Sequence, residues 1–348
     1  MIKSLTSLRG IFILFIFLHH CMNLYPGGGT MAVSFFFVLG GFSMTLGYKD
    51  RILSHEFNYR QYLVRRCIKF YPLHWLCLLL AVPFTIVIFK WTHVPVFFAN
   101  ACLAHTLLPL EKLIFSYNAV SWYLANTMFF AVMFPLIFNW IASSTTRGRI
   151  MIAALFACVY AIVAILLPVE KYHAFLYASP YMRLTDFVFG IYLALLYFKL
   201  KEQPAKWWNR AVVSQLLIFA IIALLVVESC ILSDEARLFA PVYWVLIGVV
   251  IIVASLSGRI GGGQNLLENK ILQRIGELSF IIFMIHQLVL RYTTIALENM
   301  LHIENNIVYI ALTLVLTIIL SIVVERYILK PITKWLTERI QPSMTARS

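Results

Sequence analysis

Long apolar runs dominate the chain, and short polar stretches separate them. A helix needs about 20 mostly apolar residues to cross the hydrocarbon core of a bilayer. The pattern therefore predicts an all-α integral membrane protein with about ten transmembrane helices. The predicted spans lie near residues 10–25, 31–48, 72–90, 118–142, 150–168, 183–198, 211–231, 239–257, 277–297 and 306–325.

One further apolar stretch, residues 94–110, is short and lies between Pro95 and Pro109. Proline interrupts the hydrogen-bond ladder of a helix interior. We interpret this stretch as a re-entrant or interfacial helix. No repeat or long linker divides the chain, so we expect residues 1–335 to form a single transmembrane domain and residues 336–348 a cytoplasmic tail.

Composition agrees with a membrane protein: 61% of the 348 residues are hydrophobic and 12% are charged, against about 25% charged in an average soluble domain. The net charge of +13 comes from residues at alternate ends of the predicted spans. With the N-terminus inside, 22 of the 28 Lys and Arg residues lie on the cytoplasmic side. This bias predicts that both termini are cytoplasmic, and it explains the charge by orientation and lipid contact, with no nucleic acid as partner.

Arg9 and His20 are the polar residues that make the first span unusual. Eleven residues separate them, which is about three turns plus 20°, so they share one helix face with a rise of about 16 Å between them. Ionisable groups inside a membrane usually face a cavity or a partner. His20 is a candidate proton acceptor from a hydroxyl, and Arg9 a candidate anion contact at the other end of the same groove. The alternative is that His19 or His20 only bonds a neighbouring helix.

A basic cluster enters the third span, formed by Arg65, Arg66 and Lys69. Two interpretations stay open for it. These residues are interfacial anchors, or they form a phosphate-binding patch, since the forked donors of arginine match phosphate geometry. The six cysteines form no C-x-x-C pair, so we expect neither a structural metal nor a disulfide framework.

Other polar or aromatic residues in the spans are candidate substrate contacts, and each also has a structural explanation. Trp122 fits an interfacial aromatic belt, and Asn126 is polar in apolar surroundings. Arg183 and Asp186 stand at positions i and i+3, where they can pair. Glu325 ends the tenth span, where a helix-end anchor is the simplest explanation.

Seven motifs, taken together and in this order, resemble the membrane proteins of acyltransferase family 3. Single motifs are weak, but their order along the whole chain is fairly specific. They are Leu8-Arg9-Gly10 with His20, the run from Phe36 to Phe42, the run from Arg65 to Pro72, Trp122-Tyr123-Leu124, the run from Arg183 to Gly190, the run from Leu278 to His286, and Val324-Glu325-Arg326.

The resemblance implies a membrane O-acyltransferase that moves an acyl group, usually acetyl from acetyl-CoA, onto a hydroxyl of a glycan or its lipid-linked precursor. It implies His20 as catalytic base, Arg9 as its partner in the motif, and Arg65 and Arg66, with Lys69, as contacts for the donor phosphates. A bacterial cytoplasmic (inner) membrane is the expected location. The sequence departs from the family pattern at Gly40, often Ser, at Lys69, often Arg, and at Asn126-Thr127, where many members carry Glu.

Several alternatives stay open on the sequence alone. The acceptor is a lipid-linked sugar, a polysaccharide unit, peptidoglycan or a small secondary metabolite, and transfer is direct or passes through an acyl-histidine intermediate. A homo-oligomer is also left open. The competing function is a polytopic transporter or flippase of a glycan or lipid-linked substrate, which also needs polar groups and a cavity within the membrane.

Overall fold

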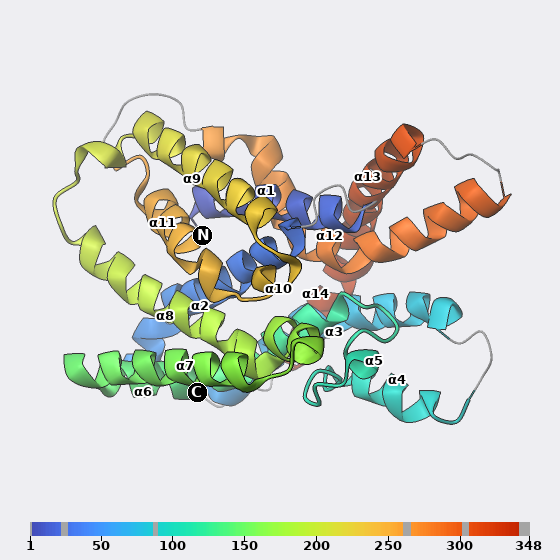
Figure 1. Ribbon diagram of the computed structural model, residues 1–348, viewed down its shortest axis with the longest axis horizontal. Helices are drawn as coiled ribbons and strands as arrows, with labels where there is room; N and C mark the ends of the chain where they lie inside the picture. The colour runs from blue at the N-terminus through green and yellow to red at the C-terminus, as the bar shows by residue number, and fades with distance from the viewer. Residues whose placement is uncertain (1, 22–26, 86–89, 260–265, 301–305, 341–348) are drawn as a thin grey trace.

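A computed structural model describes residues 2–21, 27–85, 90–259, 266–300 and 306–340. The regular structure of these residues is helical, with no strand among them (Figure 1). The long helices are α1 (Lys3–His20), α2 (Gly28–Leu53), α3 (Tyr59–Thr85), α6 (Ser121–Ser143), α7 (Thr146–Leu166), α8 (Pro180–Lys201), α9 (Ala211–Ile231), α11 (Pro241–Leu256), α12 (Lys270–Thr294) and α13 (Asn306–Val323).

Short helices connect or extend the long ones. They are α4 (His93–Ala101), α5 (Glu111–Ile114), η1 (Val169–Lys171), η2 (His173–Tyr177), η3 (Trp207–Asn209), α10 (Asp234–Arg237), η4 (Leu266–Glu268), η5 (Ile295–Met300), η6 (Val324–Leu329) and α14 (Lys330–Ile340). The stretch 94–110 contains only α4, whose nine residues are too few to cross a bilayer.

Eight helices of the described chain are long and apolar enough to cross a membrane. The predicted spans outside that set are also helical: α1 has 18 residues with Arg9 and two histidines, and α11 has 16 residues. These helices confirm the all-α membrane fold. The cytoplasmic position of the termini stays a prediction. In the predicted tail, residues 336–340 continue α14, and residues 341–348 lie outside the described part.

The first helix begins and ends earlier than the predicted span 10–25, because its polar start is buried against α12. A Cβ on Gly276 of α12 would overlap the carbonyl oxygen of Thr6, so the two backbones approach closely here. Helix α1 ends at His20, and residues 22–25 lie outside the described part. His20 is therefore the last residue of the helix.

Helices α2 and α8 form a second close contact, in which glycines from both helices face a backbone. A Cβ on Gly41 would overlap the carbonyl oxygen of Phe187, and a Cβ on Gly190 would overlap that of Val38. Without side chains at these two positions the helices pack backbone to backbone. A Cβ on Gly40, the neighbour of Gly41, would meet only the Phe187 ring, at an ordinary contact distance of 3.8 Å.

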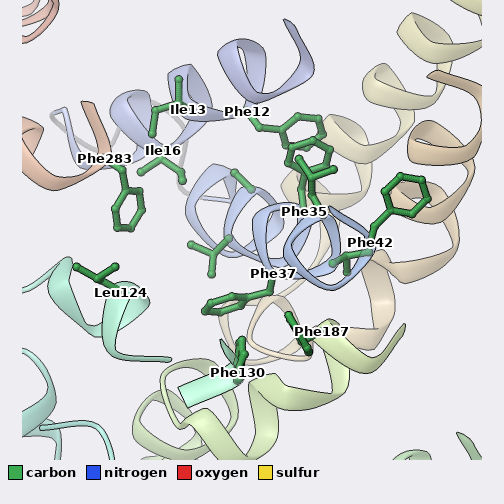
Figure 2. Packing of buried hydrophobic residues seen from close by; sticks show 14 of the residues in the cluster. Phe12, Ile13, Ile16, Phe35, Phe37, Phe42, Leu124, Phe130, Phe187 and Phe283 are labelled. Atoms are coloured by element: carbon green, nitrogen blue, oxygen red, sulfur yellow. The ribbon is translucent and has the colours of Figure 1, made fainter. Parts of the chain in front are cut away.

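Aromatic side chains fill the core around α2. This helix (blue in Figure 1) lies between the green to yellow-green helices α6 to α8 and the yellow to gold helices α9 and α11. Phe12 of α1 stacks on Phe35 of α2 with ring centroids 3.7 Å apart. Phe37 meets Phe130 edge-on at 5.1 Å, and Phe130 packs on Phe187 at 5.2 Å (Figure 2). This core fixes α1 and α2 relative to α6 and α8.

Candidate active site

Two cavities lie along α1, and we name each after the α1 residue that lines it. The Arg9 cavity has a volume of about 260 Å³ and is enclosed by α1, α2, α3, α6 and α12. The His20 cavity has a volume of about 370 Å³. It is lined by the ends of α1, α2 and α6, the residues just before α6, η2, α10 and Gln287 of α12. The candidate site therefore has two compartments.

The Arg9 cavity is cationic. Arg9, Arg66 and Lys69 line it, and its described lining contains no carboxylate. The guanidinium of Arg66 lies over the rings of Tyr48 and Tyr62, at 5.5 and 5.1 Å from their centroids. These rings orient Arg66 by cation–π contact, and its Nε atom is buried without a hydrogen-bond partner in the described structure. The arrangement suits an anion such as phosphate.

The structure separates the three members of the basic cluster. Arg66 and Lys69 face the Arg9 cavity. Arg65 is exposed and does not line it, because neighbouring residues on a helix point about 100° apart. Gly40 also lines this cavity, so the absence of a side chain there enlarges it.

The His20 cavity combines a wall of rings with polar groups. Phe115 stacks on His173 with centroids 4.7 Å apart, His173 stacks on Tyr177 at 5.2 Å, and Tyr177 meets Trp122 at 4.8 Å. Polar side chains line the same cavity: His19, His20, Thr30, Gln287 and the ion pair of Asp234 with Arg237. Apolar walls with a few convergent polar groups are typical of small-molecule sites.

His20 has a partner that its position in the sequence did not reveal. Nε2 of His286, on α12, lies 3.3 Å from Nδ1 of His20. His286 is fully buried and lines neither cavity. The sequence placed His286 inside the ninth span and within a family motif, but no spacing linked it to His20.

Bulky rings lie between the two cavities. The ring of Phe283 lines the Arg9 cavity and lies 5.9 Å from the ring of His286, which in turn contacts His20. Tyr123 packs on Phe283 at 4.7 Å from the other side. Arg9 and His20 were expected in one groove, but the structure places them in separate cavities, because the rings of Phe283 and His286 from α12 lie between them.

Arg183 and Asp186 pair as their spacing predicted, at 3.1 Å. Both side chains are fully buried. Arg183 also donates to Ser34 Oγ at 3.0 Å and lies over the Phe37 ring, and Asp186 accepts a hydrogen bond from Trp244 Nε1. The pair links α8 to α2 and α11 and lines neither cavity. A direct contact with substrate stays a prediction for these two residues.

Of the three remaining candidate substrate contacts, one lines a cavity and two do not. Trp122 lines the His20 cavity, as a substrate contact must. Asn126 is buried and donates to the carbonyl of Ala178 at 2.9 Å, away from both cavities. Glu325 accepts hydrogen bonds from Arg274 and lies 3.5 Å from Lys330, so it joins η6 to α12. Its position agrees with a helix-end anchor.

The described residues contain no group of three or more His, Cys, Asp or Glu that could hold a metal ion. The Arg9 cavity presents cations, and the His20 cavity presents imidazoles, a hydroxyl, an amide and the Asp234–Arg237 ion pair. They fit a reaction in which an anionic substrate binds in one compartment while a neutral base acts in the other.

A helical membrane protein with a cationic cavity and a histidine cavity along one helix is the class that fold and site define. The family described as "Acyltransferase domain" matches residues 2–326, and the chain belongs to this family, acyltransferase family 3. It is similar to acyltransferase MdmB of Streptomyces mycarofaciens, with 26% identity over 287 residues that cover 76% of this chain and 69% of the relative. No solved structure matches the chain. The protein is thus a membrane acyltransferase, which sets the transporter alternative aside.

Proposed function

We propose that this acyltransferase moves an acyl group, acetyl in the simplest case, from acyl-CoA to a hydroxyl of a cell-surface glycan or its lipid-linked precursor. The observation that carries the proposal is the division of α1 between two cavities. One cavity presents three cations and, in its described lining, no carboxylate. The other presents His20 beside a wall of aromatic rings, and the arginine that lines it, Arg237, is paired to Asp234. A phosphorylated donor and a neutral, hydroxyl-bearing acceptor need such different surroundings.

The donor binds with its phosphates in the Arg9 cavity, against Arg66, Lys69 and Arg9. Charge-assisted hydrogen bonds from guanidinium groups are the strongest contacts that a protein offers to phosphate. The thioester end of coenzyme A then extends along α1 toward His20 and passes the Phe283 ring that separates the cavities. The positive-inside bias of the loops supports an entrance on the cytoplasmic side. We expect the membrane to be a bacterial inner membrane.

The acceptor binds in the His20 cavity. The rings of Phe115, Trp122 and Tyr177 pack against the apolar faces of a sugar, while Thr30 and Gln287 bond its hydroxyls. Enclosure of the hydroxyl by these rings also keeps water away from the thioester, which suppresses hydrolysis.

His20 acts as the general base. Its unprotonated ring nitrogen takes the proton of the acceptor hydroxyl while the oxygen attacks the thioester carbonyl carbon. The tetrahedral intermediate collapses, the carbon–sulfur bond breaks, and the thiolate of coenzyme A takes the proton from His20. The products are an ester and free coenzyme A, and the enzyme returns to its starting state. Direct transfer needs no covalent intermediate, whereas the acyl-histidine route adds one.

The test is acceptor-dependent release of free thiol from acetyl-CoA by the purified protein in lipid nanodiscs. The same reaction is run with isotope-labelled acetyl-CoA, and the label is followed into the glycan fraction by mass spectrometry. The proposal predicts equimolar thiol release and ester formation. Thiol release that is independent of every glycan acceptor, or no turnover of acyl-CoA, contradicts it.

A further inference from the structure

His286 is a buried histidine whose ring orientation is fixed by its own helix. Its Nδ1 lies 2.7 Å from the carbonyl oxygen of Phe283 and 3.1 Å from that of Ile282. A carbonyl oxygen accepts hydrogen bonds and cannot donate them, so Nδ1 must carry the hydrogen. In the neutral ring the lone pair is then on Nε2, which is the atom that faces His20.

The same reasoning fixes the tautomer of His20. Its Nδ1 lies 2.9 Å from the carbonyl oxygen of Ile16 and 3.3 Å from Nε2 of His286. Both of these neighbours are acceptors, so Nδ1 of His20 carries a hydrogen that is shared between them as a three-centre bond. The lone pair of His20 is therefore on Nε2, and the ring that carries it lines the His20 cavity.

We propose that His286 is a positioning residue for this acyltransferase: it accepts a hydrogen bond from Nδ1 of His20 and so presents Nε2 of His20 to the acceptor hydroxyl. This inference rests on the proposed function, in which His20 is the base. His286 touches neither substrate. It occupies the place that a carboxylate takes behind the histidine of other acyl-transfer sites, where the acceptor group holds the tautomer and the ring orientation.

No proton is transferred to or from His286 during the proposed reaction. The hydroxyl proton moves to Nε2 of His20, whose ring becomes a cation, and the hydrogen bond from Nδ1 to His286 strengthens because its donor is now charged. When the thiolate leaves, it takes the proton from Nε2, and His20 returns to its neutral form. His286 keeps its hydrogen on Nδ1 throughout and lowers the barrier by stabilising the transient cation.

Two substitutions separate hydrogen bonding from packing. In His286→Gln the amide oxygen can take the position of Nε2 and still accept from His20, whereas His286→Phe fills the space without an acceptor. We expect His286→Gln to retain kcat within about threefold, and His286→Phe to lose roughly 10- to 100-fold in kcat. The KM for acyl-CoA should stay unchanged in both, because His286 does not line the Arg9 cavity.

A matched control is His74→Leu. His74 is also a buried histidine of a long helix, and its Nε2 lies 2.8 Å from the carbonyl oxygen of Asn100, but it lines neither cavity. Its substitution should leave kcat at the wild-type value. Equal kcat losses in His286→Gln and His286→Phe, at matched melting temperatures, would overturn the proposal and leave His286 with a packing role.

A second measurement is independent of activity. Nitrogen NMR of the ¹⁵N-histidine-labelled protein in lipid, assigned with His20→Gln and His286→Gln, reports which ring nitrogen carries hydrogen. The proposal requires the Nδ1–H tautomer in both His20 and His286. A hydrogen on Nε2 of His20 overturns it. If the wild-type protein uses no acyl-CoA, the proposed function fails, and the same NMR measurement on His286→Phe still decides whether His286 orients His20, because an unchanged His20 spectrum would leave that task to the Ile16 carbonyl alone.

Discussion

Arg9 and His20 lie on the same helix, α1, and line two different cavities. The rise of an α-helix puts about 16 Å between them. Phe283 and His286 occupy the space between the compartments. One helix thus holds a cationic cavity and a histidine at a fixed separation, which suits the proposed donor, whose phosphates lie far from its reacting carbon.

The contrast between Arg66 and Arg65 is the first prediction. Arg66→Ala removes a cation from the Arg9 cavity, whereas Arg65→Ala changes an exposed residue outside it. A hydrogen bond to a charged group contributes about 1.5–3 kcal/mol, so Arg66→Ala should raise the KM for acyl-CoA by about 10- to 100-fold. Arg65→Ala should change it by less than about threefold. Steady-state kinetics at constant ionic strength measure both KM values. A larger increase in Arg65→Ala than in Arg66→Ala would contradict the proposed donor site in the Arg9 cavity.

The second prediction concerns two neighbouring glycines of α2. Gly41→Ala forces a methyl group onto the Phe187 carbonyl of α8, so the helices must separate, at a cost of about 1–3 kcal/mol or more. Gly40→Ala brings its methyl group only to ordinary contact with the Phe187 ring and should change stability by less than about 0.5 kcal/mol. Thermal unfolding of both variants in the same detergent measures the difference. Equal melting temperatures would be inconsistent with the close α2–α8 contact.

A third prediction concerns the buried ion pair. Asp186→Leu leaves the fully buried Arg183 without its counter-ion, and breaking such a pair costs about 3–5 kcal/mol. The double variant Arg183→Met with Asp186→Leu removes both charges and should recover most of that loss. The double-mutant cycle is measured by thermal or denaturant unfolding. Additive losses would show that the two side chains do not stabilise each other.

The fourth prediction tests the acceptor compartment. Trp122→Ala removes a ring from the His20 cavity and should raise the KM for the acceptor about tenfold, the effect of losing one large apolar contact of about 1.4 kcal/mol. The KM for acyl-CoA should not change. The control is Trp140→Ala, because Trp140 lies on the same helix but is exposed and lines neither cavity. An increase in the KM for acyl-CoA alone would assign this cavity to the donor instead.

Local pattern was enough to predict much of the fold. Runs of apolar residues long enough to span a membrane became helices, and the proline-bounded stretch 94–110 formed only the short helix α4. The pair Arg183–Asp186 was predictable because positions i and i+3 are neighbours on any helix. The start of α1 was not predictable from local pattern, because burial of its polar first turns depends on Gly276, a residue of α12 that is distant in the sequence.

The candidate site likewise contains residues that local pattern could predict and contacts that it could not. Helical spacing singled out Arg9 and His20, and charge singled out Arg66 and Lys69; all four line a cavity, and their roles stay predictions. Charge could not separate Arg66 from Arg65, since the sequence does not say which face of α3 turns inward. The contact between His20 and His286 joins residues 266 positions apart. No local periodicity reports such a contact, which exists only once α1 packs on α12.

The most direct test of the account is the turnover of His20→Ala in nanodiscs, measured with saturating acyl-CoA and acceptor. If His20 is the base, kcat should fall by at least about 100-fold, while the affinity for acyl-CoA, measured separately by equilibrium binding, stays at the wild-type value because His20 does not line the Arg9 cavity. A properly folded His20→Ala protein that acylates the acceptor at the wild-type rate would contradict the central claim.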